Sequence, residues 1–190
     1  MDTFFAPTLP HILFYIITIL WILEFIIFPS KYDNGDYQEK KSFLYILAGI
    51  VTTITLTIIL TWFNLFTISN YFMHFIGISF YIVGIGLRYT SSIKLGKYFT
   101  RDVQVKEDQE LISDGPYKIL RHPLYLGLFL LTIAVPLFFQ NILMLVFAIL
   151  VMGVLLNNRM QIEEKNMETV LGNKYILWKN ERYRFIPFIY

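Results

Sequence analysis

Long apolar runs separated by polar segments dominate the chain. Three of them cover about residues 9–28, 43–66 and 71–87, and a fourth continues without a charged residue from Leu124 to Leu156. A helix needs about 20 residues to cross the hydrocarbon core of a bilayer. Each of the first three runs therefore predicts one membrane helix.

The fourth run is too long for one upright helix and too short for two of full length. Pro136 and the pair Gln140-Asn141 lie near its middle, where a tight helical hairpin would turn. We therefore predict an all-α integral membrane protein with about five transmembrane helices, the last two forming a short hairpin. It is expected to be one membrane-embedded domain, with three helices in residues 1–90 and the hairpin and a C-terminal helical segment in residues 91–190.

Composition and charge agree with this class. Hydrophobic residues make up 56% of the chain and charged residues 16%, which excludes an ordinary soluble domain. Lysine and arginine gather after the first and third runs and after the hairpin, whereas the connection over residues 64–70 has none. The positive-inside rule then predicts a multi-pass protein with its N-terminus outside and both long polar segments cytoplasmic.

The same counts limit the chemistry. A formal net charge of +2 and no interleaved aromatic and basic motif predict no nucleic-acid partner. The chain has no cysteine, which excludes disulfides, thiolate metal sites and a cysteine nucleophile. We expect no bound metal and, as partners, membrane lipids.

The first polar segment leads to a helix start of unusual composition. Ser113-Asp114-Gly115-Pro116 is typical of a turn, and Arg121-His122-Pro123 opens the fourth apolar run. Proline suits the first turn of a helix, whose free N–H groups and positive dipole end can hold an anion. The alternative is a basic anchor at the membrane interface.

The second polar segment continues from the last apolar run. If the helix extends, Arg159 and Glu163 share a face while Glu164 points about 100° away. The pair could be an ordinary surface ion pair, yet charged residues at a membrane edge are candidates for function. Elsewhere, Glu24 is expected to snorkel to the interface, His74 to be an interfacial residue on the outer side, and residues 182–187 to form a surface tail.

Five motifs occur in the order seen in one family, the isoprenylcysteine carboxyl methyltransferases with their prokaryotic and phospholipid-methylating relatives. The resemblance covers about residues 95–187. The motifs are Gly96-Lys97-Tyr98-Phe99-Thr100, Leu111-Ile112 with Gly115-Pro116-Tyr117, Arg121-His122-Pro123-Leu124-Tyr125-Leu126-Gly127, Arg159 with Glu163-Glu164, and Leu171-Gly172-Asn173-Lys174-Tyr175. Met167, Leu171 and Trp178 depart from the residues usual there.

The resemblance implies a membrane enzyme that uses S-adenosyl-L-methionine and methylates the carboxylate of an isoprenylcysteine-like or other lipophilic acceptor, which would enter from the bilayer. We also expect the cofactor to be bound by a cytoplasmic loop and the second half of the chain, residues 91–190, to be catalytic. Arg159 and His122 would be catalytic, with Arg159 also binding the acceptor. The cofactor would contact Gln104, Gln109, Glu110, Leu111, Ile112, Tyr117, His122, Pro123, Leu124, Tyr125 and Glu163. The alternatives are a methyltransferase acting on a small thiol or a phospholipid amine, for which His122 could assist deprotonation, and a non-catalytic lipid-binding protein that kept the scaffold.

Overall fold

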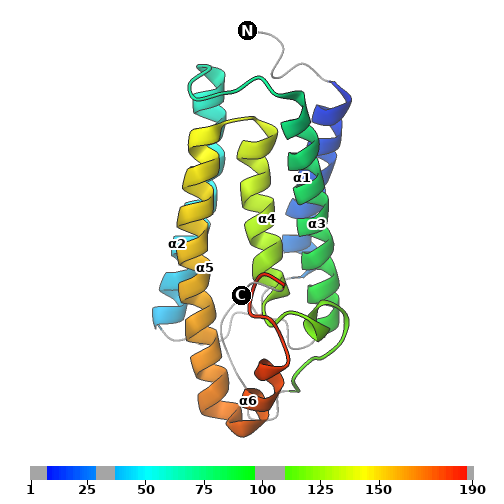
Figure 1. Cartoon of the computed structure of the whole chain (residues 1–190), viewed down its shortest axis with the longest axis vertical. Helices are drawn as coiled ribbons and strands as arrows, with labels where there is room; N and C mark the ends of the chain where they lie inside the picture. The colour runs from blue at the N-terminus through cyan, green and yellow to red at the C-terminus, as the bar shows by residue number, and fades with distance from the viewer. Residues whose placement is uncertain (1–7, 29–36, 97–109, 188–190) are drawn as a thin grey trace.

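A bundle of five long helices forms the molecule. The computed structural model describes residues 8–28, 37–96 and 110–187. It places α1 (Leu9–Ile27), α2 (Tyr37–Trp62), α3 (Tyr71–Leu95), α4 (Pro123–Phe138) and α5 (Ile142–Leu171) along one axis, with a short α6 (Asn173–Asn180) folded back beyond the end of α5 (Figure 1). The described residues hold no strands beyond two isolated bridges. The all-α prediction is therefore confirmed.

Three of these helices, α2 from Lys41, α3 and α5, are long and apolar enough to cross a membrane, and α1 and α4 are shorter apolar helices. The predicted hairpin is present. Pro136 lies in the last turn of α4, Gln140 adopts the left-handed conformation at φ 57°, and the Asn141 side chain accepts a hydrogen bond at the start of α5. The prediction that both hairpin helices are short was wrong for α5, because this helix continues for 30 residues to Leu171.

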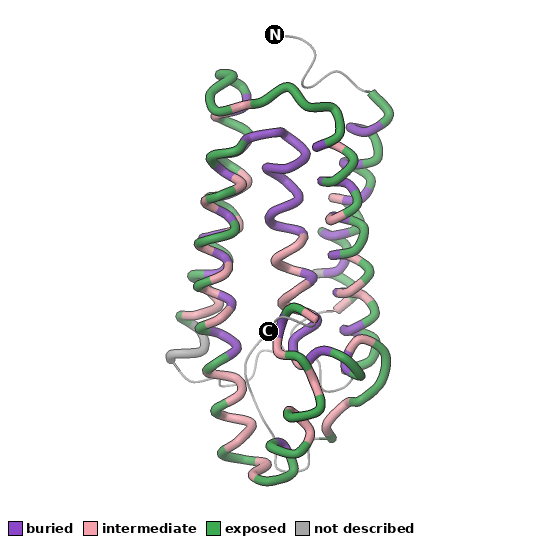
Figure 2. The backbone as a smooth tube through the Cα atoms, viewed as in Figure 1, coloured by how far each residue is buried: buried purple, intermediate pink, exposed green. Residues whose placement is uncertain are grey.

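Unlike a soluble protein, this bundle is apolar on its outside as well as in its core. Large apolar side chains on the outer faces of α1, α2, α3 and α5 are exposed, whereas α4 runs through the middle and every residue from 131 to 141 is buried (Figure 2). Several polar side chains point inward instead, including Thr53, Thr57 and Arg88. An apolar exterior around a partly polar interior fits helices that are surrounded by lipid.

Glycines bring α3 and α4 into close contact. A Cβ atom on Gly84 would lie 2.9 Å from the carbonyl oxygen of Gly127, and one on Gly127 would lie 2.7 Å from Cγ of Arg88. A Cβ atom on Gly77 would similarly approach the backbone of Phe138. Small residues at such crossings let helix backbones approach in membranes.

A buried ion pair joins α1 to α3. Nε and Nη2 of Arg88 donate to the two carboxylate oxygens of Glu24 at 2.6 and 2.5 Å, and Glu24 is only 1% exposed. The expectation that Glu24 reaches the interface was therefore wrong, because Arg88 lies on the adjacent helix and neutralises it inside the bundle. A helix-period argument on the Glu24 segment alone could not reveal this partner.

Polar contacts also fix the opposite end of the bundle. Gln140 accepts a hydrogen bond from the backbone of Asn70, and its amide lies 2.5 Å from Nε2 of His74. The backbone of residues 66–68 pairs with that of residues 140–142. The connection between α2 and α3 thus packs on the hairpin turn, so the polar segments that follow α3 and α5 both leave from the other end.

Candidate active site

The first segment of the site is a turn followed by the start of α4. Gly115 has φ 58°, in the left-handed region that favours glycine. The short 3₁₀ helix η2 (Gly115–Lys118) follows and packs against α3. Tyr117 is buried on η2, His122 is the residue before α4, and Pro123 is its first residue. The turn and the proline-initiated helix were both predicted.

A tyrosine hydroxyl connects the two charged residues that the sequence placed on one face of α5. Tyr125, in the first turn of α4, donates to Oε2 of Glu163 at 2.7 Å, and Nε of Arg159 donates to the same hydroxyl at 3.3 Å. Arg159 is buried and also donates to Ser42 of α2 at 2.5 Å. Three helices therefore converge on Arg159 and Glu163.

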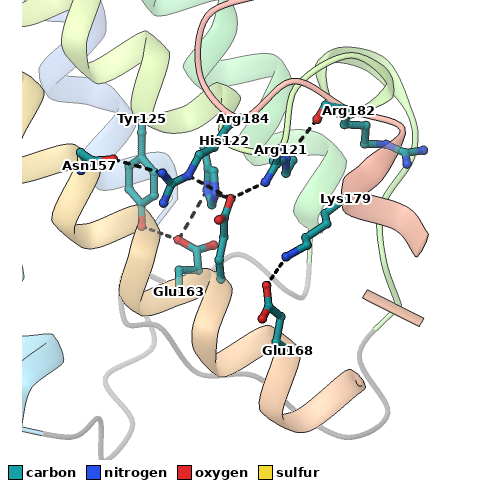
Figure 3. Close-up of polar contacts among 10 residues, drawn as sticks. Arg121, His122, Tyr125, Asn157, Glu163, Glu168, Lys179, Arg182 and Arg184 are labelled. Atoms are coloured by element: carbon teal, nitrogen blue, oxygen red, sulfur yellow. Dashed lines mark hydrogen bonds and ion pairs between the residues drawn. The ribbon is translucent and has the colours of Figure 1, made fainter. Parts of the chain in front are cut away.

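Glu164 is the centre of a second group of contacts, and Figure 3 shows its partners Arg121, His122 and Arg184 near the Tyr125–Glu163 hydrogen bond. Its Oε1 lies 3.0 Å from Nη1 of Arg121, 3.0 Å from Nε2 of His122 and 3.2 Å from Nε of Arg184. A carboxylate only accepts hydrogen bonds, so His122 carries a proton on Nε2. Glu164 thus has its own partners in the segment before α4 and in the C-terminal segment, apart from the Tyr125 hydroxyl that links Arg159 and Glu163.

The segment after α6 returns to the site. Tyr183 exchanges backbone hydrogen bonds with Ile119 and Arg121, and Arg182 donates to the carbonyl of Tyr117 at 2.9 Å. Arg184 donates to Asn157 of α5 at 3.1 Å, and Phe185 is buried. Residues 182–187 therefore do not form the predicted surface tail. Hydrogen bonds to η2, to the residues after it and to α5 hold this segment against the bundle instead.

Burial changes the acidity of two tyrosines outside the membrane helices. Desolvation, and then the nearby Glu163 carboxylate, raises the pKa of Tyr117 well above its ordinary value. Desolvation, and then Glu164 and Glu163, raises the pKa of Tyr175 in α6. Both phenols stay neutral through the physiological range.

The structure brings together most of the predicted site residues. His122, Pro123, Leu124 and Tyr125 form the start of α4 opposite Glu163 and Arg159. Leu111 and Ile112 are half-buried, Glu110 is exposed, and Gln104 and Gln109 lie outside the described residues. The sequence reasoning missed Ser42, Arg121 and Arg184 as contributors, and only the resemblance motif around Arg121 carried a signal for one of them.

The described site contains carboxylates, an imidazole and several guanidinium groups. Within the described ranges, no group of three or more His, Cys, Asp and Glu side chains is arranged to hold a metal ion. The arrangement offers a carboxylate for a cation at Glu163 and a guanidinium for an anion at Arg159, held apart by one phenol. This can bind two oppositely charged groups side by side.

Comparisons with known proteins match this fold and these motifs. The model of the isoprenylcysteine carboxyl methyltransferase (ICMT) family matches residues 75–169. A protein-S-isoprenylcysteine O-methyltransferase of Saccharomyces cerevisiae is 35% identical over 107 residues, covering 54% of this chain and 45% of the relative. The protein-S-isoprenylcysteine O-methyltransferase B of Arabidopsis thaliana is 25% identical over 124 residues, covering 64% and 60%. This chain thus spans about half of the length of these relatives.

A solved structure described as the eukaryotic intramembrane Ras methyltransferase ICMT has the same fold. It aligns with a TM-score of 0.71 at 22% identity, covering 98% of this chain and 70% of that chain. The helical bundle, with its apolar outer faces and a polar cluster at one end, is that of an integral membrane protein. The chain belongs to the isoprenylcysteine carboxyl methyltransferase family.

Proposed function

We propose that this protein is an S-adenosyl-L-methionine-dependent methyltransferase of the membrane that methylates the carboxylate of an isoprenylcysteine-like or other lipophilic acceptor. The observation that carries the proposal is the Tyr125 hydroxyl between Glu163 and Arg159. It supports the proposal because a carboxylate for a cation and a guanidinium for an anion then lie side by side where α4 begins. Family membership supplies the reaction class.

The residues fit the cofactor. Its ammonium group matches the Glu163 carboxylate, which is 25% exposed and so open to a ligand. The apolar, half-buried Leu111, Ile112 and Leu124 suit an adenine ring, with the buried Tyr117 beside them. When bound, the cofactor supplies an activated methyl group on a sulfonium. Gln104 and Gln109, which the resemblance adds, remain part of the proposal.

The acceptor carboxylate would be held by Arg159. Its guanidinium stays protonated and is oriented by Ser42 and Tyr125, so it can bind a carboxylate but not remove a proton. A carboxylate is already ionised at neutral pH and needs no base. Catalysis would then rest on orienting the two groups and excluding water. The prenyl or acyl part of the acceptor would reach the site from the bilayer.

Two measurements test the function. Purified protein in detergent should bind S-adenosylhomocysteine by calorimetry, and absence of binding would favour a non-catalytic scaffold. Membranes given labelled S-adenosylmethionine should transfer label to prenylcysteine rather than to small thiols or phosphatidylethanolamine. For a carboxylate acceptor the rate should not climb between about pH 7 and 9. A steep climb would favour a thiol or amine acceptor.

The Arg159→Lys variant separates the two substrates. It should bind S-adenosylhomocysteine normally, because Arg159 serves the acceptor. Turnover should fall at least tenfold, about 1.4 kcal/mol at the transition state, since an ammonium cannot reproduce the planar guanidinium. Full activity of the lysine variant on prenylcysteine would remove Arg159 from the acceptor site.

The proposal also includes the orientation of the protein across the membrane. With the active site on the side of the basic segments, the N-terminus would lie outside and the site would face the cytoplasm. Accessibility labelling of a cysteine introduced at Asn173, in a chain that has none of its own, would test this.

A further inference from the structure

Two serine hydroxyls next to the proposed cofactor site have no hydrogen-bond partner within the described part of the chain. Ser91 and Ser92, near the end of α3, are both 0% exposed, and both Oγ atoms are unpaired. A buried hydroxyl without a partner costs roughly 1–3 kcal/mol. Their position therefore calls for a physical explanation.

The ordinary solution for a helical hydroxyl is used elsewhere in this protein. Seven others donate to the carbonyl oxygen four residues earlier: Thr18, Thr53, Thr57, Ser79, Thr90, Thr132 and Thr169. Thr90 does so directly beside Ser91. Thr61, at the far end of α2, shares the unpaired state but lies away from the site. Ser91 and Ser92 are thus turned away from a partner that their neighbour uses.

Both serines lie where α3 meets the turn that precedes α4. They continue the buried stripe of α3 that includes Gly84 and Arg88, and η2 packs against this helix. The Ser91 hydroxyl lies near the Tyr117 hydroxyl, where a weak hydrogen-bond interaction opposes the rise in the Tyr117 pKa without reaching full hydrogen-bond geometry. Tyr117 in turn feels the charge of Glu163. The Ser91 hydroxyl therefore borders the proposed cofactor site, and Ser92 is the next residue of the same buried stripe.

We propose that Ser91 and Ser92 are cofactor-binding residues that hydrogen-bond uncharged polar groups of the cofactor's nucleoside part. This inference rests on the proposed function. Glu163 matches the charged amino-acid end, whereas the region of η2 and α3 offers neutral hydroxyls beside an aromatic ring. Each hydroxyl can donate and accept, which suits ribose hydroxyls or the edge of adenine.

Binding of two ligands to single variants tests the proposal. Ser91→Ala and Ser92→Ala should each weaken S-adenosylhomocysteine about three- to tenfold by calorimetry, the range of a neutral hydrogen bond. They should weaken 5′-methylthioadenosine, which keeps the nucleoside and lacks the amino acid, by a similar factor. Glu163→Gln should weaken only S-adenosylhomocysteine. Ser79→Ala, the same change at an exposed and bonded site of α3, should alter neither.

Stability of the ligand-free protein provides a second measurement. Removing an unpaired buried hydroxyl should leave the melting temperature unchanged or raise it, while the affinity falls. The Ser91→Cys side chain is nearly the same size and a weaker donor, so the ligand affinity of this variant should lie between those of wild type and Ser91→Ala. Unchanged affinity for both ligands in the alanine variants would overturn this inference and leave the proposed function standing. Failure of wild-type protein to bind S-adenosylhomocysteine would overturn both.

Discussion

Two adjacent glutamates show how differently neighbouring residues of one helix are used. Glu163 accepts a hydrogen bond from a neutral phenol and its side chain is 25% exposed. Glu164 is 12% exposed and lies within ion-pair distance of Arg121, His122 and Arg184. The first carboxylate can take up a ligand's cation, whereas the second is committed to the protein.

Exchanging each glutamate for glutamine should separate the two roles. Glu163→Gln should weaken S-adenosylhomocysteine by about 1.5–3 kcal/mol with little loss of thermal stability. Glu164→Gln should instead lower stability by about 2–4 kcal/mol, because it leaves three clustered basic groups without their carboxylate. Calorimetry and melting in detergent measure both. If Glu164→Gln melts like wild type, the ion-pair cluster is not structural.

The residue patterns predicted some of these roles and not others. Spacing along α5 correctly placed Arg159 and Glu163 on one face, and the proline correctly placed the start of α4. Spacing gives a direction only relative to the helix itself. It therefore could not show that Arg184, twenty residues further along, reaches back to Glu164, or that Ser42 of α2 contacts Arg159.

Among the helices, the contact between α3 and α4 has the most direct bearing on the site. Arg88 lies against the backbone of α4 at Gly127 and pairs with Glu24 of α1. Its Nη1 also approaches the carbonyl oxygen of Leu124 at 3.4 Å. This pair therefore ties α1 and α3 to the turn of α4 that carries Tyr125.

Breaking one half of the Glu24–Arg88 pair should be costly. Glu24→Gln should destabilise the protein by about 3–5 kcal/mol, because the Arg88 charge would remain buried without a counter-charge. The double variant Glu24→Leu, Arg88→Met should recover most of that loss, since it removes both charges. Thermal melting of the single and double variants forms the test, and equal melting of wild type and Glu24→Gln would contradict it.

Hydropathy located the helices well but could not say what covers them. The run from Leu124 to Leu156 correctly predicted a hairpin at Gln140-Asn141. An apolar residue looks the same whether it faces lipid or protein, so the pattern could not show that α4 has no exposed residue while α5 has many. Nor could a window of apolar residues show α5 continuing to Gly172, whose φ of 55° ends the helix.

At the scale of the whole molecule, the C-terminal part of the chain folds back onto the end of the helical bundle that carries the proposed site. α6 turns back from the end of α5, and residues 182–187 run beneath α4 to the cluster around Glu164 (Figure 1). Tyr175 of α6 is buried in this folded-back C-terminal part, near both Glu163 and Glu164. The packing of the C-terminal part on the bundle therefore favours the neutral form of Tyr175.

Alkaline pH should weaken the packing of the folded-back C-terminal part on the bundle. The pKa of Tyr175 is raised in the folded protein, so its contribution to stability is complete below about pH 10, the unfolded value, and declines as pH rises above it. Tyr175→Phe should make melting less sensitive to pH above 10, with Tyr71→Phe at the exposed far end as control. Trp178 fluorescence would follow the change. The same alkaline sensitivity in Tyr175→Phe and wild type would assign the effect to other groups.

The close glycine contacts of α3 and α4 carry a consequence for how the protein loses its structure. In lipid, the hydrophobic effect does not drive helices together, so close backbone packing and buried polar pairs must stabilise the bundle. When those contacts fail, each helix still satisfies its own backbone and has no reason to unwind. The bundle should therefore separate into intact helices, and circular dichroism would record almost nothing at the temperature where ligand binding is already gone.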